Sequence, residues 1–274
     1  MNTITQFANN LFAYEFMRNA FIAGTLAAVV ASLMGYFVVL RRQNFAAHAL
    51  SHIGFAGAAG AGLVSLDPAS GQLILTILAA FGMGGLGARA TKSDIAVGVT
   101  LAFALGLGML FLYFYSNYAS RAMAILFGNL LSVSPALIKK MAIYSIISLV
   151  GLAGISRPLL FASLEPELAE AKGISLPLIS VLFLILVSIA ITEASQVVGI
   201  LLVFTLLIGP AASASYCTRN FWTGLVLSML LGLVTVWVGL ILTYFTNWPV
   251  SFWISALSLV IYLLFRYLSA SARV

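Results

Sequence analysis

Long apolar runs, separated by short polar or glycine- and proline-containing breaks, are the dominant pattern of this chain. Most runs reach about 20 residues, the length that an α-helix needs to cross a bilayer, and they lack the period-two alternation of barrel strands. Because lipid offers the backbone no hydrogen bonds, this pattern predicts an all-α membrane protein. The predicted spans lie near residues 18–40, 44–65, 70–88, 95–116, 138–160, 177–194, 197–217, 222–245 and 250–268.

Two further segments are too short or too mixed to cross. Residues 4–17 are aromatic and partly polar, which predicts an N-terminal interfacial helix. The run Ala122–Leu131 predicts a re-entrant or surface segment. About nine crossings would put the two termini on opposite sides, and the absence of a dividing linker predicts a single transmembrane domain, residues 1–274.

Composition supports this class, because 62% of the residues are hydrophobic and only 7% are charged, against about a quarter in soluble domains. The net charge of +6 is therefore interpreted as cytoplasmic loop charge rather than as a nucleic-acid surface. With the N-terminus outside, the inner side holds nine basic residues: Arg41, Arg42, Arg89, Lys92, Arg157, Lys172, Arg219, Arg266 and Arg273. The outer side holds four, namely Arg18, Arg121, Lys139 and Lys140, of which the last two fit this orientation badly.

The only two histidines, His48 and His52, are four residues apart in a predicted span. This spacing places both imidazoles on one helix face, and residues 46–62 around them are mostly alanine and glycine. Small residues allow close helix packing in lipid, so we expect a central helix. Ionisable residues inside a membrane are costly and mark functional sites, and imidazole is a common metal ligand. The alternative is a structural pair, each imidazole bonded to a neighbouring carbonyl.

The second charged feature is a loop with four of the chain's twenty Asp, Glu, Lys and Arg residues: Glu165, Glu167, Glu170 and Lys172. Pro166 suits the first turn of a helix, and Gly173 suits the left-handed residue that ends one. The pattern predicts a short cytoplasmic helix. Such a helix is either a solvated connection or, as we favour, a docking element for a partner.

Glu193 is the only acidic residue within a predicted span, near its outer end. Three interpretations are open. Glu193 could guide cations into an outer mouth, could reach the headgroup region, or could cap the next helix, since helix N-termini favour negative charge.

Three stretches resemble the ABC-3 family, the permease subunits of ATP-binding-cassette importers for zinc, manganese and iron. The stretches are Val39-Leu40-Arg41-Arg42 with Ala49-Leu50-Ser51-His52; Leu126-Phe127-Gly128-Asn129; and Glu165-Pro166-Glu167-Leu168-Ala169 and Gly173 with Gln196-Val197-Val198-Gly199 and Leu207-Ile208-Gly209-Pro210. They span most of the chain in the expected order.

The resemblance implies a permease that is not itself an enzyme and has no tightly bound cofactor. It would work as a homodimer in the bacterial cytoplasmic membrane, with ATPase subunits that grip the charged loop (Glu165, Glu167, Ala169, Glu170, Gly173) and an extracytoplasmic solute-binding protein. His48, His52 and Glu193 are the candidate pathway residues.

One departure concerns the metal. The family signature Gly-Asp-Ala-Leu-Ser-His has aspartate four residues before the histidine, and here that position is His48. Imidazole suits zinc better than manganese, which prefers oxygen ligands, so zinc is expected over manganese or iron. The alternative function is a self-sufficient secondary transporter or channel in which the histidines relay protons or metal.

Overall fold

The computed structural model describes residues 13–85, 94–116, 118–128, 133–218 and 220–271, and all regular structure within these ranges is helical. Most of the predicted interfacial segment at residues 4–17 lies outside them. So do residues 129–131 of the predicted short run, and Arg89, Lys92, Arg219 and Arg273.

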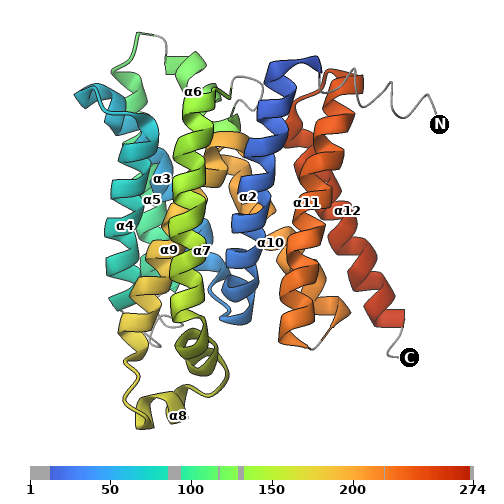
Figure 1. Ribbon diagram of the computed structural model, residues 1–274. Coiled ribbons are helices and arrows are strands. Elements are labelled where there is room, and N and C mark those ends of the chain that lie inside the picture. The colour runs from blue at the N-terminus through green and yellow to red at the C-terminus, as the bar shows by residue number, and fades with distance from the viewer. Residues whose placement is uncertain (1–12, 86–93, 117, 129–132, 219, 272–274) are drawn as a thin grey trace, which may run out of the picture.

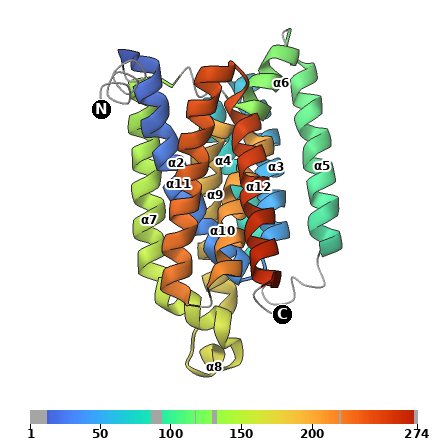
Figure 2. The same cartoon turned by 90° about the vertical axis from the view of Figure 1, so that its right-hand side faces the viewer.

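Long helices run side by side along one axis, and two short helices mark its opposite ends (Figures 1 and 2). The helices are α2 (Glu15–Leu40), α3 (Asn44–Ala61), α4 (Pro68–Gly85), α5 (Asp94–Tyr113), α6 (Tyr118–Phe127), α7 (Pro135–Leu164), α8 (Pro166–Ala171), α9 (Leu176–Val198), α10 (Ile200–Cys217), α11 (Phe221–Thr246) and α12 (Val250–Ser271), with a 3₁₀ turn η1 (Gly62–Val64) after α3. Helix α8 lies at one end of the bundle and α6 at the other (Figure 1).

Six described helices are long and apolar enough to cross a membrane: α2, α7, α9, α10, α11 and α12. Helices α4 and α5 contain shorter apolar stretches, at residues 68–84 and 97–113. Helix α3 is not among the six, because its two histidines, Asn44, Ser51 and its glycines lower its mean hydropathy. The all-α membrane class is confirmed, while the count of nine crossings stays a prediction.

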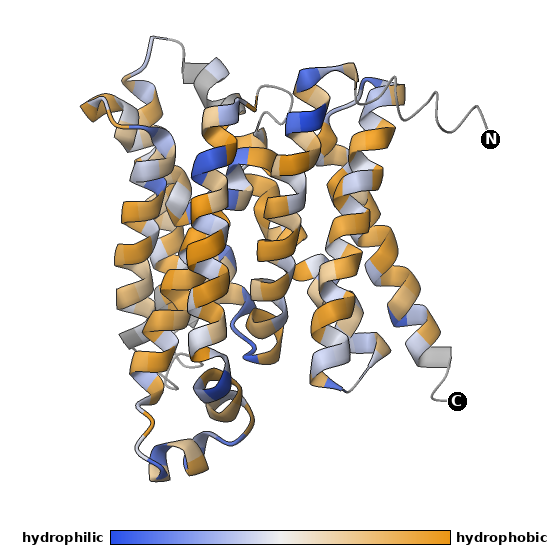
Figure 3. Cartoon of the chain, viewed as in Figure 1, coloured by the Kyte–Doolittle hydropathy of each residue, from blue (hydrophilic) through white to orange (hydrophobic). Residues whose placement is uncertain are grey.

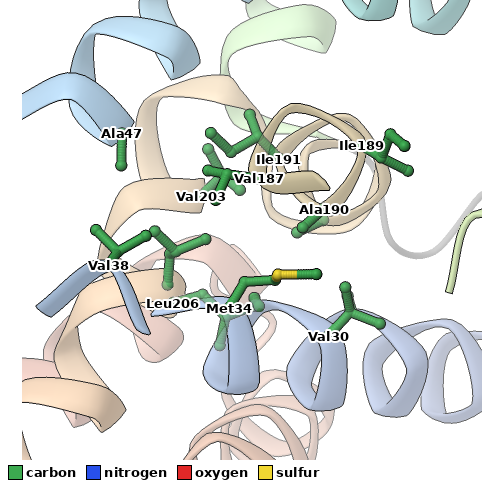
Figure 4. Packing of buried hydrophobic residues seen from close by; sticks show 14 of the residues in the cluster. Val30, Met34, Val38, Ala47, Val187, Ile189, Ala190, Ile191, Val203 and Leu206 are labelled. Atoms are coloured by element: carbon green, nitrogen blue, oxygen red, sulfur yellow. The ribbon is translucent and has the colours of Figure 1, made fainter. Parts of the chain in front are cut away.

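The main hydrophobic core forms where α2, α9 and α10 meet. Val30, Met34 and Val38 of α2 face Val187 and Ile191 of α9, and Val203 and Leu206 of α10 complete the contact (Figure 4). Hydrophilic residues gather mostly toward the ends of the bundle and on α8 (Figure 3). This distribution fits an apolar belt between two aqueous faces.

Helix α3 is central, as its small residues predicted. It packs against α4, α5, α9 and α10, and most of its side chains are buried. A Cβ at Gly57 would lie 2.3 Å from the carbonyl oxygen of Gly71 in α4. The two backbones therefore meet at a distance that only glycine allows, as is typical of helix contacts in membranes.

Lys139 and Lys140, which fitted the orientation badly, lie at the start of α7, at the end of the bundle opposite α8. Lys140 Nζ is 2.6 Å from Asp67 Oδ2, in the turn between α3 and α4. This ion pair offsets part of the positive charge at that end.

Candidate functional site

His48 and His52 lie together on one face of α3, as their spacing predicted. Their ring centroids are 4.6 Å apart with an interplanar angle of 83°. The His48 ring also packs edge-on against Phe204 of α10, with centroids 4.8 Å apart. The pair therefore faces the α3–α10 contact.

Neither histidine uses its Nδ1 atom within the described part of the chain. Both Nδ1 atoms are buried without a hydrogen-bond partner. A neutral imidazole offers one donor and one acceptor, and an unsatisfied buried nitrogen is unfavourable. Neither Nδ1 atom therefore makes the bond to a neighbouring carbonyl that the structural alternative expects.

The pair belongs to the half of α3 nearer α8. At 1.5 Å per residue, His48 is about 6 Å and His52 about 12 Å along the helix from Asn44. Further along α3, Phe55, Ala58 and Ala59 form an apolar cluster with Ile200 of α10 and with Ile125 and Leu126 of α6. This cluster separates the histidines from the end of the bundle opposite α8.

Glu193 lies on the side of α9 that faces α7, away from the α3–α10 contact that holds the histidines. It is fully buried, and its Oε1 accepts a hydrogen bond from Ser145 Oγ of α7, while Oε2 has no partner among the described residues. The capping interpretation is wrong, because Gly199 is the N-cap of α10 and no side chain caps that helix. Burial also rules out a side chain that reaches the headgroups, so of the three interpretations only the pathway role remains open.

The described residues contain no group of three or more His, Cys, Asp and Glu side chains that could hold a metal. A cavity of about 580 Å³ lies at the end opposite α8, between α2, α6, α9, α11 and α12. Its lining is mainly aromatic and apolar, and it includes none of His48, His52 and Glu193. The cavity is therefore separate from the histidine pair.

The charged loop forms the predicted short helix. Pro166 occupies the first turn of α8, and Gly173 adopts a left-handed conformation with φ of 80°. Ala169 is fully buried, where α8 packs against α7 and α9, whereas Glu165, Glu167 and Glu170 are exposed. One side of α8 is thus fixed to the bundle, and its acidic side is open to solvent.

Sequence reasoning missed the side chains that surround this loop. Arg41, at the end of α2, reaches Ser163 of α7 and Ser180 of α9, which flank α8 on either side. The sequence separations of 122 and 139 residues leave no local signal for these contacts.

Comparisons with known proteins agree with the arrangement of helices. Residues 13–269 match the ABC 3 transport family. The manganese import system permease protein ScaB of Streptococcus parasanguinis is 28% identical over 271 residues, which cover 98% of this chain and 96% of that protein. The manganese transport system membrane protein MntC of Listeria monocytogenes is 29% identical over 242 residues, covering 88% and 86% of the two chains.

The fold is also known from a solved structure. The chain superposes on PsaBC from Streptococcus pneumoniae in complex with Fab with a TM-score of 0.86 at 26% identity, covering 96% of this chain and 95% of that one. The family match extends over nearly the whole sequence and includes α3, α8 and the α9–α10 junction. This chain belongs to the ABC-3 transport family, and it is a multi-pass transport subunit of the bacterial cytoplasmic membrane rather than an enzyme.

Proposed function

We propose that this chain is the permease subunit of an ATP-driven importer for a divalent transition metal. It would act as a homodimer, with cytoplasmic ATPase subunits on α8 and a solute-binding protein at the opposite face. The relatives named manganese import or transport proteins support the substrate class and the direction.

The observation that carries the proposal is the histidine pair. Two imidazoles with ring centroids 4.6 Å apart lie on a helix packed between other helices, and each has a buried nitrogen without a hydrogen-bond partner among the described residues. Polar atoms in a helix bundle normally find partners, and imidazole nitrogen is a good ligand for transition metals. A passing metal ion would satisfy these atoms.

Two ligands alone do not complete a metal site, since zinc usually has four. The described residues of one chain supply no third side chain of the right type. A second copy related by a twofold axis would bring two more imidazoles, which supports a pathway between two protomers. Binding would have to stay weak enough for release, as conduction requires.

The choice of metal rests on the donor atoms. The relatives are named for manganese, which prefers oxygen ligands, whereas paired imidazoles favour zinc. We infer a preference for zinc from His48, with manganese as the alternative that the relatives suggest. Equal rescue of zinc-starved and manganese-starved growth by the intact system would refute this preference.

The exposed acidic face of α8 supports ATPase docking. The exposed glutamates would bind basic groups of the ATPase. Reversing two charges, Glu167→Lys with Glu170→Lys, would set lysines against those basic groups, and like charges across an interface cost several kcal/mol. Co-purification of the ATPase subunits and metal uptake should therefore fall by about tenfold or more. For ATPase co-purification the matched control is Glu15→Lys, an exposed acid at the other end of the bundle.

This experiment also separates the two candidate functions. A secondary transporter or channel would need no ATPase, and α8 would then be dispensable. Unchanged uptake in the double variant, with normal amounts of protein in the membrane, would favour that alternative.

A further inference from the structure

The guanidinium of Arg41 is a half-buried cation bound only by neutral groups. It lies at the C-terminal cap of α2, and no carboxylate pairs with it among the described residues. Burial lowers the pKa of the Arg41 guanidinium from its ordinary value, but that value is so high that the group stays charged. A half-buried cation without a carboxylate partner does little to keep a loop soluble, and its contacts indicate another role.

Its hydrogen bonds join three segments that are distant in sequence. Arg41 Nη1 donates to Ser163 Oγ at 3.2 Å, and Nη2 donates to Ser180 Oγ at 2.8 Å. The guanidinium carbon also lies 5.7 Å from the ring centroid of Phe183. Ser163 precedes α8 in the last turn of α7, and Ser180 and Phe183 follow it in α9. One side chain thus holds both helices from which α8 extends.

Arg41 also contacts the turn that connects α2 to α3, the helix that carries the histidines. Arg42 and Gln43 close the end of α2 through backbone bonds to Val39 and Val38, at 3.1 and 3.0 Å, the pattern of a Schellman motif. Gln43 is then the N-cap residue of α3, and its Oε1 accepts a hydrogen bond from Arg41 Nε at 3.2 Å. The turn between α2 and α3 is therefore fixed, and His48 follows only seven residues after Arg41.

We propose that Arg41 is a positioning residue that transmits movement of the α8 loop to the histidine-bearing start of α3. The inference rests on the proposed role of α8 as the ATPase contact. When an ATPase displaces α8, the ends of α7 and α9 move with it, and Arg41 pulls the α2–α3 turn along. Arginine suits this role because its planar, multi-donor fork holds several acceptors at once, which a lysine ammonium on a flexible stem does not.

The test uses the complete importer in liposomes, with its ATPase subunits and solute-binding protein, and measures zinc or manganese transported per ATP hydrolysed. In Arg41→Gln the ratio should fall by about fivefold or more, the lower range of coupling between distant sites, while ATPase binding is retained. Arg41→Lys should not restore the ratio. A purely structural role would lower the amount of assembled complex and leave the ratio unchanged.

Two further variants make the result decisive. Arg42→Gln removes the neighbouring exposed charge and should leave the ratio as in the wild type. The pair Ser163→Ala with Ser180→Ala keeps the charge and removes its acceptors, and should lower the ratio even if Arg41→Gln does not assemble.

A wild-type ratio in Arg41→Gln, or in the serine double variant, would overturn the inference, as would an equal loss in Arg42→Gln. If instead the wild-type chain neither binds an ATPase nor transports metal, it is the proposed function that fails.

Discussion

Imidazoles at both positions 48 and 52 give the candidate pathway a softer donor set than a carboxylate with an imidazole would. The structure places the rings in contact and puts the aromatic ring of Phe204 beside His48. The Phe204 ring offers no oxygen ligand, so the selectivity of the site should follow the two imidazoles.

Replacement of His48 by aspartate is therefore expected to shift uptake from zinc toward manganese. His48→Asp should raise the ratio of manganese to zinc uptake, because a carboxylate oxygen suits manganese. His52→Ala should reduce uptake of both metals by roughly tenfold or more, as loss of metal-positioning groups commonly does. Competition uptake of the two metals by the assembled system measures both effects, and an unchanged ratio in His48→Asp would show that residue 48 does not select the metal.

A substitution of the buried Glu193 can distinguish a role in the metal pathway from a role in helix packing. Glu193 is fully buried and accepts a hydrogen bond from Ser145 Oγ, and a charged carboxylate without a cation nearby is very unfavourable in a helix bundle. Glu193→Gln keeps shape and hydrogen bonding, and should leave uptake unchanged if the residue only packs α9 on α7. A strong loss of uptake in this variant, with normal assembly, would support the pathway role instead.

At the scale of helices, a close approach of backbones joins α6 to the α9–α10 junction. Gly199 is the only residue between α9 and α10, with φ of 85° and ψ of 159°. Gly128, which follows α6, also has a positive φ, 68°. A Cβ on Gly199 would lie 2.3 Å from the carbonyl oxygen of Leu126 and 2.5 Å from the nitrogen of Gly128. Glycine is needed here for both conformation and space.

Gly199→Ala is thus expected to lower the free energy of unfolding by roughly 1–3 kcal/mol from the backbone conformation alone, with an added loss from displacement of α6. Thermal unfolding of the detergent-solubilised protein measures the change. Gly154→Ala in α7 is the matched control, because nothing lies within 4 Å of its Cβ position and alanine favours helix. Equal unfolding temperatures in the two variants would contradict the close contact at Gly199.

Some helices could be predicted from local sequence because local chemistry determines them. Pro166 and Gly173 bound α8 as expected, and the small residues of α3 correctly predicted a central helix. The end of α9 was predicted less well, since the predicted spans stop at residue 194 and resume at residue 197. In the structure, Thr192, Ser195 and Gln196 bond back to carbonyls of their own helix, so α9 continues to Val198.

Contacts between distant segments could not be predicted in this way. The partners of Arg41 and the bond between Ser145 and Glu193 depend on how helices pack, and no periodicity along one chain encodes them. The convergence of the candidate site was therefore predictable only within α3, where a spacing of four residues brings His48 and His52 together.

For the molecule as a whole, the two ends of the bundle differ in kind. One end carries α8, the α2–α3 turn with Arg41 and Arg42, and the C-terminal end of α12 (Figure 1). The other carries α6 and the Lys140–Asp67 pair. Among the described residues, Arg41, Arg42 and Lys172 lie at the α8 end without a carboxylate partner. By the positive-inside rule we therefore expect this end to face the cytoplasm, where ATPase subunits could reach it.

The single cysteine, Cys217, allows this orientation to be tested without disturbing the fold. It is exposed at the end of α10, at the same end of the bundle as α8 (Figure 2). A membrane-impermeant maleimide should therefore label the wild-type chain in inside-out vesicles and not in intact spheroplasts. In a Cys217→Ser background, Ser116→Cys, exposed beyond the other end of α5, should show the opposite pattern. Labelling of Cys217 from the outside would reverse the orientation, and α8 could then not meet a cytoplasmic ATPase.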